Sequence, residues 1–283
     1  MISCFLIGGL GNQLFQIFTT ISLAISNKIK FVFINLETLT DGSPNTTIRY
    51  TYWKNILSRL IPFLTHEYEY NVIEKEKTFE YDEVNIISNT NDKILLIGYY
   101  QSYKYFETNY TTIYKLLNFD KQKEIVLKKI QLSADYLTNS ISIHFRIGDY
   151  KKLIDYHPIM NYNYYENSLN YIKTKNTSDN INVIYFYEEE DIDAVNEIIN
   201  KLKQQFTTYN FISVNKNLED WEQMLFMSSC NHNIIANSSF SWWAAYLNSW
   251  NNKIVCYPSK WFGCKALHNT KDLSPPDWIK IEV

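Results

Sequence analysis

Short apolar runs of strand length alternate along this chain with segments whose apolar residues recur at helical spacing. The pattern is clearest in the second half, where we expect strands at 140–147, 183–187, 211–214, 233–237 and 253–257. The expected helices between them are 161–175, 191–206, 219–228 and 240–250. Strands that alternate with helices of about 10–15 residues form parallel βαβ units. The sequence therefore predicts an α/β fold with parallel sheets, in which ligands bind at the carboxyl ends of the strands.

The first half follows the same pattern less regularly. We expect strands at 2–7, 31–35 and 94–100, and helices at 13–26, 53–60, 103–118 and 121–132. Residues 36–92 are otherwise ambiguous, apart from a turn predicted at 41–44. A chain of 283 residues has room for two domains. We place an N-terminal domain at 1–135 and a C-terminal domain at 136–283.

Several classes of protein are excluded by composition and spacing. The formal net charge of −3 lacks the basic excess of a nucleic-acid-binding protein. No run of about 18 apolar residues suggests a membrane span, and glycines at 8–11 interrupt the apolar N-terminus before it could act as a signal peptide. The four cysteines and five histidines lack metal-binding spacing. Asp191 and Asp193 begin an expected helix, where acids complement its dipole. We expect a cytoplasmic protein without a metal.

A glycine-rich turn follows the first expected strand, since residues 8–11 contain three of the seven glycines. Glycine lets backbone N–H groups approach a ligand closely, and the following helix N-terminus favours an anion. The dinucleotide fingerprint is incomplete because Leu14 stands where its third glycine would be, and no Gly-Lys-Ser/Thr follows. The turn therefore indicates a phosphate or sugar loop of another type, or a tight turn without a ligand. Asn12 and Gln13 could cap the helix.

Residues 141–147 alternate strictly between apolar and polar side chains, so His144 and Arg146 share one face of the expected strand. The opposite face is apolar and should pack in the core. An arginine near the carboxyl end of a parallel strand lies where a pyrophosphate would bind, and its planar fork can hold phosphate with two hydrogen bonds. Asp149 would orient that arginine or accept a proton. The alternative is a purely structural ion pair between Arg146 and Asp149.

Residues 238–241 place three serines around Phe240, directly after an expected strand. Hydroxyls and free backbone N–H groups at a helix start can bind an anion. Simple capping of the helix by Ser238 or Ser239 is the alternative. We expect at least one of Trp242 and Trp243 to lie in the core, and the other could stack on a base.

Four stretches together resemble the α-1,2-fucosyltransferase family, in the family's order and across most of the chain. They are Gly-Gly-Leu-Gly-Asn-Gln-Leu-Phe-Gln at 8–16, Gly-Tyr-Tyr-Gln-Ser-Tyr-Lys-Tyr-Phe at 98–106, His-Phe-Arg-Ile-Gly-Asp-Tyr at 144–150, and the segment 224–248. The most specific part is Asn-Ser-Ser-Phe-Ser-Trp-Trp at 237–243, followed by the glycine loop with its Asn-Gln. The tail at 260–262 and 276–281 is also similar.

The resemblance implies a GT-B-like fold, in which two Rossmann-like domains with parallel sheets face each other across a cleft. The N-terminal domain would then be the acceptor side and the C-terminal domain the GDP-sugar donor side. The family transfers L-fucose from GDP-fucose to a sugar hydroxyl with inversion, usually to the 2-OH of a terminal galactose, in glycan or surface polysaccharide synthesis. The implied partners are GDP-fucose and a glycan acceptor, with no metal or other cofactor.

The family's motifs also imply roles for individual residues. Arg146 would hold the donor pyrophosphate, His144 would lie beside it and Asp149 would orient the loop, which makes these three the catalytic candidates. The donor-binding candidates are Gly9, Gly11, Asn12, Gln13, Arg146, Glu188, Asn237, Ser238, Ser239 and Phe240.

Two positions depart from the family's pattern. Ile147 replaces the second of two adjacent arginines, although the alternation puts position 147 on the apolar face of its strand. Tyr-Glu-Glu at 187–189 replaces Ser-Asp-Asp, so that Glu188 retains a carboxylate. The alternatives are a transferase with another nucleotide-sugar donor, a non-catalytic nucleotide-sugar or glycan-binding protein and, less well supported, an NAD-type oxidoreductase. The general base stays open: Asp149 is one candidate, and a loosely dissociative reaction needs little base.

Overall fold

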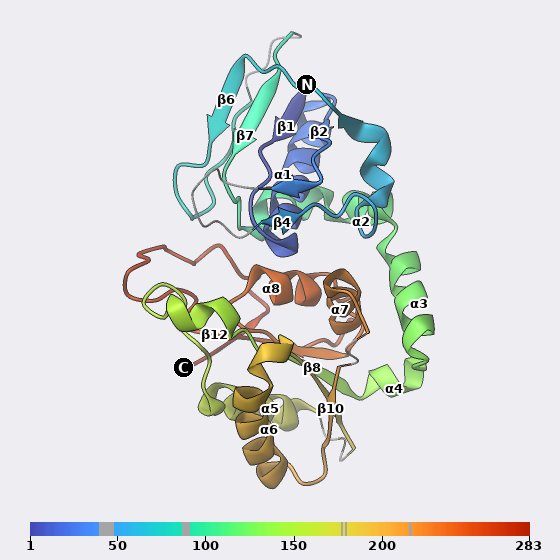
Figure 1. The fold of residues 1–283 in the computed structure, drawn as a ribbon, viewed down its shortest axis with the longest axis vertical. Coiled ribbons are helices and arrows are strands. Elements are labelled where there is room, and N and C mark those ends of the chain that lie inside the picture. Colours follow the sequence, from blue (N-terminus) through green and yellow to red (C-terminus); the bar gives the residue numbers. More distant parts are fainter. Residues whose placement is uncertain (40–47, 87–90, 177, 179, 215–216) are drawn as a thin grey trace. The chain divides into compact units, whose positions relative to one another are not determined.

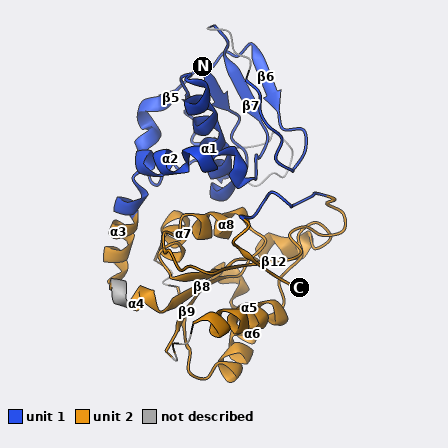
Figure 2. Cartoon of the chain, turned by 180° about the vertical axis from the view of Figure 1, so that it is seen from behind, with its two compact units in different colours: residues 1–122, 268–275 blue, residues 123–267, 276–283 orange. Residues whose placement is uncertain are grey.

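The computed structural model describes residues 1–39, 48–86, 91–176, 178, 180–214 and 217–283, so the turn predicted at 41–44 lies outside the described residues. The chain divides into two compact units (Figure 2). Unit 1 comprises residues 1–122 and 268–275, and unit 2 comprises residues 123–267 and 276–283. The division at 122/123 falls inside helix α3 (Phe119–Ile130), earlier than the boundary that the sequence suggested. Residues 268–275, which we had placed in the C-terminal domain, group with unit 1.

Unit 2 is built on one six-stranded parallel sheet with the order β10-β9-β8-β11-β12-β13 (Figure 1). Its strands are β8 (Ser140–His144), β9 (Asn182–Phe186), β10 (Asn210–Ser213), β11 (His232–Ile234), β12 (Val255–Pro258) and β13 (Ile279–Ile281). Numbered from β8, this is the 3-2-1-4-5-6 order of a Rossmann sheet. The predicted α/β class with a parallel sheet is therefore confirmed.

Helices cover both faces of this sheet, with α5 and α6 on one side and α7 and α8 on the other (Figure 1). Their bounds are α5 (Tyr162–Lys175), α6 (Ile192–Gln205), α7 (Asp220–Met227) and α8 (Ser239–Tyr246), and a short α4 (Ala134–Thr138) precedes β8. The connections also contain the 3-10 helices η4 (Gly148–Lys152) and η5 (Glu189–Asp191).

The central strand β8 is buried on both faces because helices cover both. Ile141, Ile143, Phe145 and Ile147 lie in the core beside α5 and α6, as the apolar alternation predicted. On the other face, Ser142 is fully buried, with its Oγ accepting a 2.7 Å hydrogen bond from Asn233 Nδ2 of β11. The strand itself ends at His144, three residues earlier than expected.

Unit 1 is a smaller α/β unit, whose described residues form three short sheets. The main sheet is parallel and has the order β1-β7-β6, while β2 pairs with β5 and β3 pairs with β4. The strands are β1 (Ile2–Cys4), β2 (Phe33–Ile34), β3 (Thr38–Leu39), β4 (Arg49–Tyr50), β5 (Leu64–Thr65), β6 (Val72–Lys75) and β7 (Ile94–Ile97). The helices are α1 (Leu10–Asn27), α2 (Tyr110–Leu117), η1 (Ser58–Phe63), η2 (Tyr103–Tyr105) and η3 (Glu107–Asn109). The predicted helix at 53–60 is wrong, since only its last residues enter the 3-10 helix η1.

Helix α1 is the buried core element of unit 1, because apolar and small residues occupy nearly all of its surface. Its buried Gln16 joins two loops of the sheet. Gln16 Oε1 accepts a 3.0 Å hydrogen bond from the N–H of Ile7, after β1, and its Nε2 donates to the carbonyl of Gly98, after β7, at 3.1 Å. Gln16 therefore fixes the loops at the carboxyl ends of β1 and β7 to one another.

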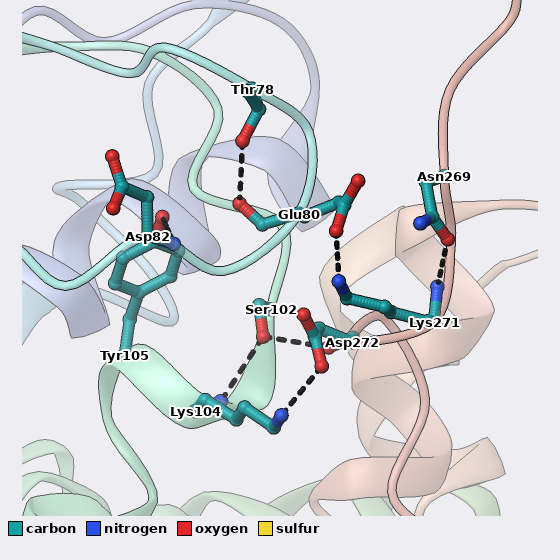
Figure 3. A network of polar contacts seen from close by, with 9 residues as sticks. All are labelled: Thr78, Glu80, Asp82, Ser102, Lys104, Tyr105, Asn269, Lys271 and Asp272. Carbon is teal, nitrogen blue, oxygen red and sulfur yellow. Dashed lines mark hydrogen bonds and ion pairs between the residues drawn. The ribbon is translucent and has the colours of Figure 1, made fainter.

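The C-terminal segment 268–275 is anchored within unit 1 by a polar network (Figure 3). Asp272, which is 7% exposed, accepts a hydrogen bond at 2.5 Å from Lys104 Nζ, and Ser102 Oγ donates to its carbonyl at 2.6 Å. Lys271 forms an ion pair with Glu80. Because Ser102 and Lys104 belong to the motif at 98–106, hydrogen bonds to this segment fix the motif although the two are distant in sequence.

Among the helices of the described residues, none is long and apolar enough to cross a membrane. The four cysteines are unpaired, and Cys4, Cys230 and Cys256 are buried.

Candidate active site

The strand order of unit 2 reverses at β8: the chain goes from β8 outward through β9 and β10, then returns to β11 on the other side of β8. Ligands of open parallel sheets bind at this switch point, outside the carboxyl ends of the two strands where it occurs. Strand β8 ends at His144, the loop after it carries Arg146 and Asp149, and the loop after β11 carries Asn237 and Ser238. The residues selected from two distant motifs therefore meet at the edge where this fold binds ligands.

Arg146 is held by two carboxylates and one aromatic ring. Its Nη1 is paired with Glu188, and its Nη2 donates to Asp149 Oδ1 at 2.6 Å. The guanidinium lies 5.2 Å from the centre of the Tyr150 ring, within the range of a cation–π contact. Its side chain is 20% exposed, whereas those of Asp149 and Glu188 are 48% and 45% exposed. The planar fork is therefore fixed in orientation and still reaches solvent.

The loop that contains Asp149 is fixed from the following βα connection. Asp191 is almost fully buried, and its Oδ2 accepts a 2.6 Å hydrogen bond from the N–H of Gly148. Its Oδ1 accepts another at 2.6 Å from Lys151 Nζ. Gly148 leaves room for Glu188, because a Cβ at position 148 would lie 2.3 Å from Glu188 Oε2. Asp191 thus does more than complement a helix dipole: it positions the Arg146 loop, a role the sequence did not reveal.

His144 is 7% exposed, and its Nδ1 is buried without a hydrogen-bond partner. Burial, assisted by the nearby charge of Arg146, lowers the pKa of His144 to about 3. The imidazole is therefore neutral at physiological pH and offers hydrogen bonding without a charge. Its ring centre lies 5.5 Å from that of Phe240, so the end of β8 contacts the first turn of α8.

The loop after β11 leads directly into helix α8. Ser238 Oγ accepts a 3.3 Å hydrogen bond from the N–H of Phe240, so the capping that the sequence suggested is present. Asn237 Nδ2 donates to the carbonyls of Pro158 and Trp261, and the carbonyl of Asn237 accepts a 3.0 Å hydrogen bond from the Tyr150 hydroxyl. Asn237 Oδ1 is buried and has no protein partner. The Tyr150 ring therefore connects Arg146 with the start of α8.

Trp242 and Trp243 are both fully buried, and their rings pack at 5.3 Å with Trp242 also stacked on Tyr246. Both tryptophans of the motif are core residues, so neither is placed to stack on a nucleotide base. Part of this sequence motif therefore serves core packing.

In unit 1, the glycine turn after β1 has one position that requires glycine. Gly8 has φ +81°, and a Cβ there would lie 2.4 Å from Asn12 Nδ2. Gly9, by contrast, faces open space, and Leu10 begins α1 without a side-chain cap. Gln13 Nε2 donates to the carbonyls of Gly8 and Tyr50, which ties the turn to β4. The predicted residues 9–13 thus form one helix start, organised by Gly8 and Gln13, in which Gly11 and Gln13 are buried.

Asn12 is joined to the second motif of unit 1, because Gln101 Nε2 donates to its Oδ1 at 2.8 Å. Glu76, directly after β6, accepts hydrogen bonds from the N–H groups of Tyr99 and Tyr100. The loops after β1, β7 and β6 therefore form one connected edge. Glu76 was missed in the ambiguous region 36–92, and its position beside a family motif emerges only from strand pairing.

A pocket of about 420 Å³ lies elsewhere on unit 1, with Ser22 and Ser26 of α1 and Lys104 in its wall. Helix α1 rises about 1.5 Å per residue, so Ser26 lies roughly 21 Å along the helix from Asn12. The pocket is therefore separate from the strand-end edge.

Comparison with known proteins identifies the family. The family model described as glycosyl transferase family 11 matches residues 1–282. The chain belongs to glycosyl transferase family 11. It is 31% identical over 218 residues to an α-1,2-colitosyltransferase of Escherichia coli, covering 73% of this chain and 69% of that protein. The O-antigen biosynthesis glycosyltransferase WbnK of Escherichia coli is 30% identical, with 57% of this chain and 56% of WbnK covered. A galactoside 2-α-L-fucosyltransferase of Caenorhabditis elegans is 24% identical, with coverage of 96% and 77%.

Two solved glycosyltransferases have lower similarity. The ADP-heptose heptosyltransferase II of Escherichia coli gives a TM-score of 0.36 at 16% identity, covering 56% of this chain and 42% of that one. A family 9 glycosyl transferase of Veillonella parvula gives 0.47 at 9% identity, covering 100% and 86%. The two α/β units, each with a parallel main sheet, agree with the expected GT-B-like class, and the family membership makes this protein a glycosyltransferase.

Ile147 lies where the sequence pattern placed it. It follows the end of β8 by three residues, is 5% exposed and packs in the core of unit 2, whereas Arg146 is paired with Asp149 and Glu188. An arginine with the same side-chain direction would place a charge in that core. An isoleucine in place of the family's second arginine is therefore compatible with this fold, and Arg146 is the arginine that the loop retains.

Proposed function

We propose that this glycosyltransferase transfers L-fucose from GDP-fucose to a sugar hydroxyl with inversion and without a metal, with the 2-OH of a terminal galactose as the expected acceptor. The observation that carries the proposal is the position of Arg146 at the switch point of unit 2, with its fork fixed by Asp149 and Glu188. A planar guanidinium at this edge suits the pyrophosphate of a nucleotide sugar.

The chemistry assigned to unit 2 is stabilisation of the leaving group. As the bond between fucose C1 and the β-phosphate breaks, negative charge builds on GDP. Arg146 and the backbone N–H groups at the start of α8 stabilise that charge. His144 remains neutral because of its lowered pKa, so it would orient the donor through hydrogen bonding. Gly9, Gly11, Asn12 and Gln13 lie in unit 1 and remain donor-binding candidates, and we also assign the acceptor to that unit.

Colitose is the alternative sugar, because the colitosyltransferase relative is 31% identical. Colitose is L-fucose without its 3-hydroxyl, so the two donors differ by one hydrogen-bonding group. A site built to bind that hydroxyl would reject the deoxy sugar by as much as about 10⁴–10⁵-fold, whereas an apolar site discriminates weakly. The ratio of turnover with GDP-fucose to turnover with GDP-colitose therefore shows whether the site binds the 3-hydroxyl with a polar group or faces that position with an apolar one.

The test is to incubate the purified protein with GDP-fucose or GDP-colitose and a panel of β-galactosides, with and without EDTA. Acceptor-dependent GDP release with a product heavier by one fucose, unchanged by EDTA, supports the proposal. Turnover of GDP-colitose alone would change the donor but keep the class. GDP-fucose binding without turnover on any acceptor would favour a binding protein, and loss of activity in EDTA would overturn the metal-independent mechanism.

A further inference from the structure

Three loops of unit 1 end at one edge because their strands are parallel neighbours. β7 lies between β1 and β6, and the register pairs Cys4 with Leu96 and Lys75 with Ile97. Glu76 follows β6 immediately, and its N–H donates to the carbonyl of Ile97 at 2.9 Å. Its side chain therefore belongs to the same strand-end edge as the glycine turn, the edge to which we assign the acceptor.

Glu76 is held at this edge by the backbone of the 98–106 motif. Its Oε2 accepts a hydrogen bond from the N–H of Tyr99 at 2.7 Å, and its Oε1 accepts one from Tyr100 at 2.9 Å. Gly98 has φ +159°, and a Cβ there would lie 2.4 Å from Glu76 Cβ, so the chain approaches this side chain closely. Each carboxylate oxygen has a second lone pair that these N–H groups do not use.

Burial raises the pKa of Glu76, and the two backbone N–H groups only partly oppose this effect. Among the described residues, the phenols of Tyr100 and Tyr105 interact electrostatically with the Glu76 carboxylate, and Tyr100 also interacts with Glu74. The pKa of Tyr105 is raised to about 12, and that of Tyr100 is raised further, chiefly by burial. Among the described residues, no cation forms an ion pair with Glu76. By contrast, the Asp149 carboxylate is paired with Arg146.

We propose that Glu76 is the general base that takes the proton from the attacking hydroxyl of the acceptor sugar. This inference rests on the proposed function. In the step, the O–H proton moves to a free lone pair of Glu76, and the hydroxyl oxygen forms a bond to fucose C1. The bond between C1 and the phosphate oxygen breaks, and its electron pair leaves with GDP. Glu76 then releases its proton to water.

The first test compares Glu76→Gln with the matched control Glu74→Gln, two residues earlier and within β6. Loss of a general base should lower kcat/KM by about 10²–10⁴-fold. The wild type and Glu74→Gln should lose activity as the pH falls through the raised pKa of Glu76, and Glu76→Gln should lack this acidic limb. A Glu76→Gln enzyme with near wild-type activity and the same acidic limb would overturn the role while leaving fucosyl transfer intact.

The second test uses sodium azide as the nucleophile, because azide has no proton to lose. If Glu76 is the base, GDP release from GDP-fucose with azide should be similar in wild type and Glu76→Gln, while transfer to a galactoside falls. If Glu76 only holds the loop, the variant should lose both reactions together and melt at a lower temperature, which overturns the proposal. A wild type that transfers fucose to no acceptor would refute the proposed function, and the proposed role of Glu76 would fail with it.

Discussion

Replacing Arg146 with lysine keeps the positive charge but removes the planar fork that Asp149 and Glu188 hold. In the wild type, the two carboxylates bind different terminal nitrogens of the guanidinium. A lysine ammonium is a compact charge on a flexible stem and cannot reproduce two parallel hydrogen bonds to phosphate. We therefore expect Arg146→Lys to impair the transition state much more than it impairs folding.

The structure allows the loss of folding stability and the loss of catalytic rate to be calculated separately. Both carboxylates are close to half exposed, so each can return to water when its partner changes, and each such ion pair contributes about 0.2–1 kcal/mol. The free energy of unfolding should fall by at most ~2 kcal/mol, a shift of a few degrees in Tm. Loss of a preorganised donor to developing charge costs about 10²–10³ in rate, or roughly 2.7–4 kcal/mol. The catalytic loss should therefore exceed the stability loss.

The assay is acceptor-dependent GDP release at saturating acceptor, with GDP affinity measured by calorimetry and Tm by differential scanning fluorimetry. Arg59→Lys is the matched control, since Arg59 is exposed in η1 of unit 1 and has no assigned role. An Arg146→Lys enzyme with near wild-type kcat/KM would refute the bidentate role. A collapse of Tm by tens of degrees would refute the view that the two ion pairs contribute little to folding.

Three further outcomes follow from the described contacts. Glu188→Gln removes one negative charge beside Arg146, so GDP should bind severalfold more tightly; tenfold weaker binding would instead indicate a direct contact between Glu188 and the nucleotide. Tyr164→Phe leaves two buried carbonyls without the phenol and should cost about 1–3 kcal/mol of stability in urea unfolding, whereas no change would contradict that cost. Burial lowers the pKa of His144 to about 3 and of His232 to about 4, below the ordinary 6.5, so the folded protein binds fewer protons than the unfolded chain. The contribution of these two histidines to the free energy of unfolding should be fully present above pH 6.5. It should fall by about 1–3 kcal/mol per pH unit as acid is added. A constant Tm from pH 7 to 5 would contradict this.

Unit 2 was more predictable than unit 1 for a physical reason. Its strands β9 and β12 are largely apolar, β8 alternates strictly between apolar and polar residues, and helices separate successive strands from β8 to β12. The same alternation correctly placed Ile147 in the core. In unit 1, several strands are only two residues long, too short to carry a period, and β6 lies in a polar segment that pairs with β7 across 22 residues from Val72 to Ile94.

The candidate site divides in the same way. His144, Arg146 and Asp149 were accessible from one local motif, because a strand and its following loop place them together. Asp191 and Glu76 were not, because each acts on the backbone of a loop that is distant in sequence. The roles of these two carboxylates depend on tertiary contacts, which form only when the strand order brings two loops to one edge of the sheet.

The segment 268–275 has a consequence for the order in which the protein can be completed during synthesis. Unit 1 begins at the N-terminus, yet the Asp272 that binds Ser102 and Lys104 emerges 150 residues after Gln122. At translation rates of about 5–20 residues per second, roughly 8–30 s pass between the synthesis of Gln122 and that of Asp272. The unit whose synthesis starts first is therefore not the first to be finished, and a premature stop shortly before residue 268 would leave its 98–106 motif without support.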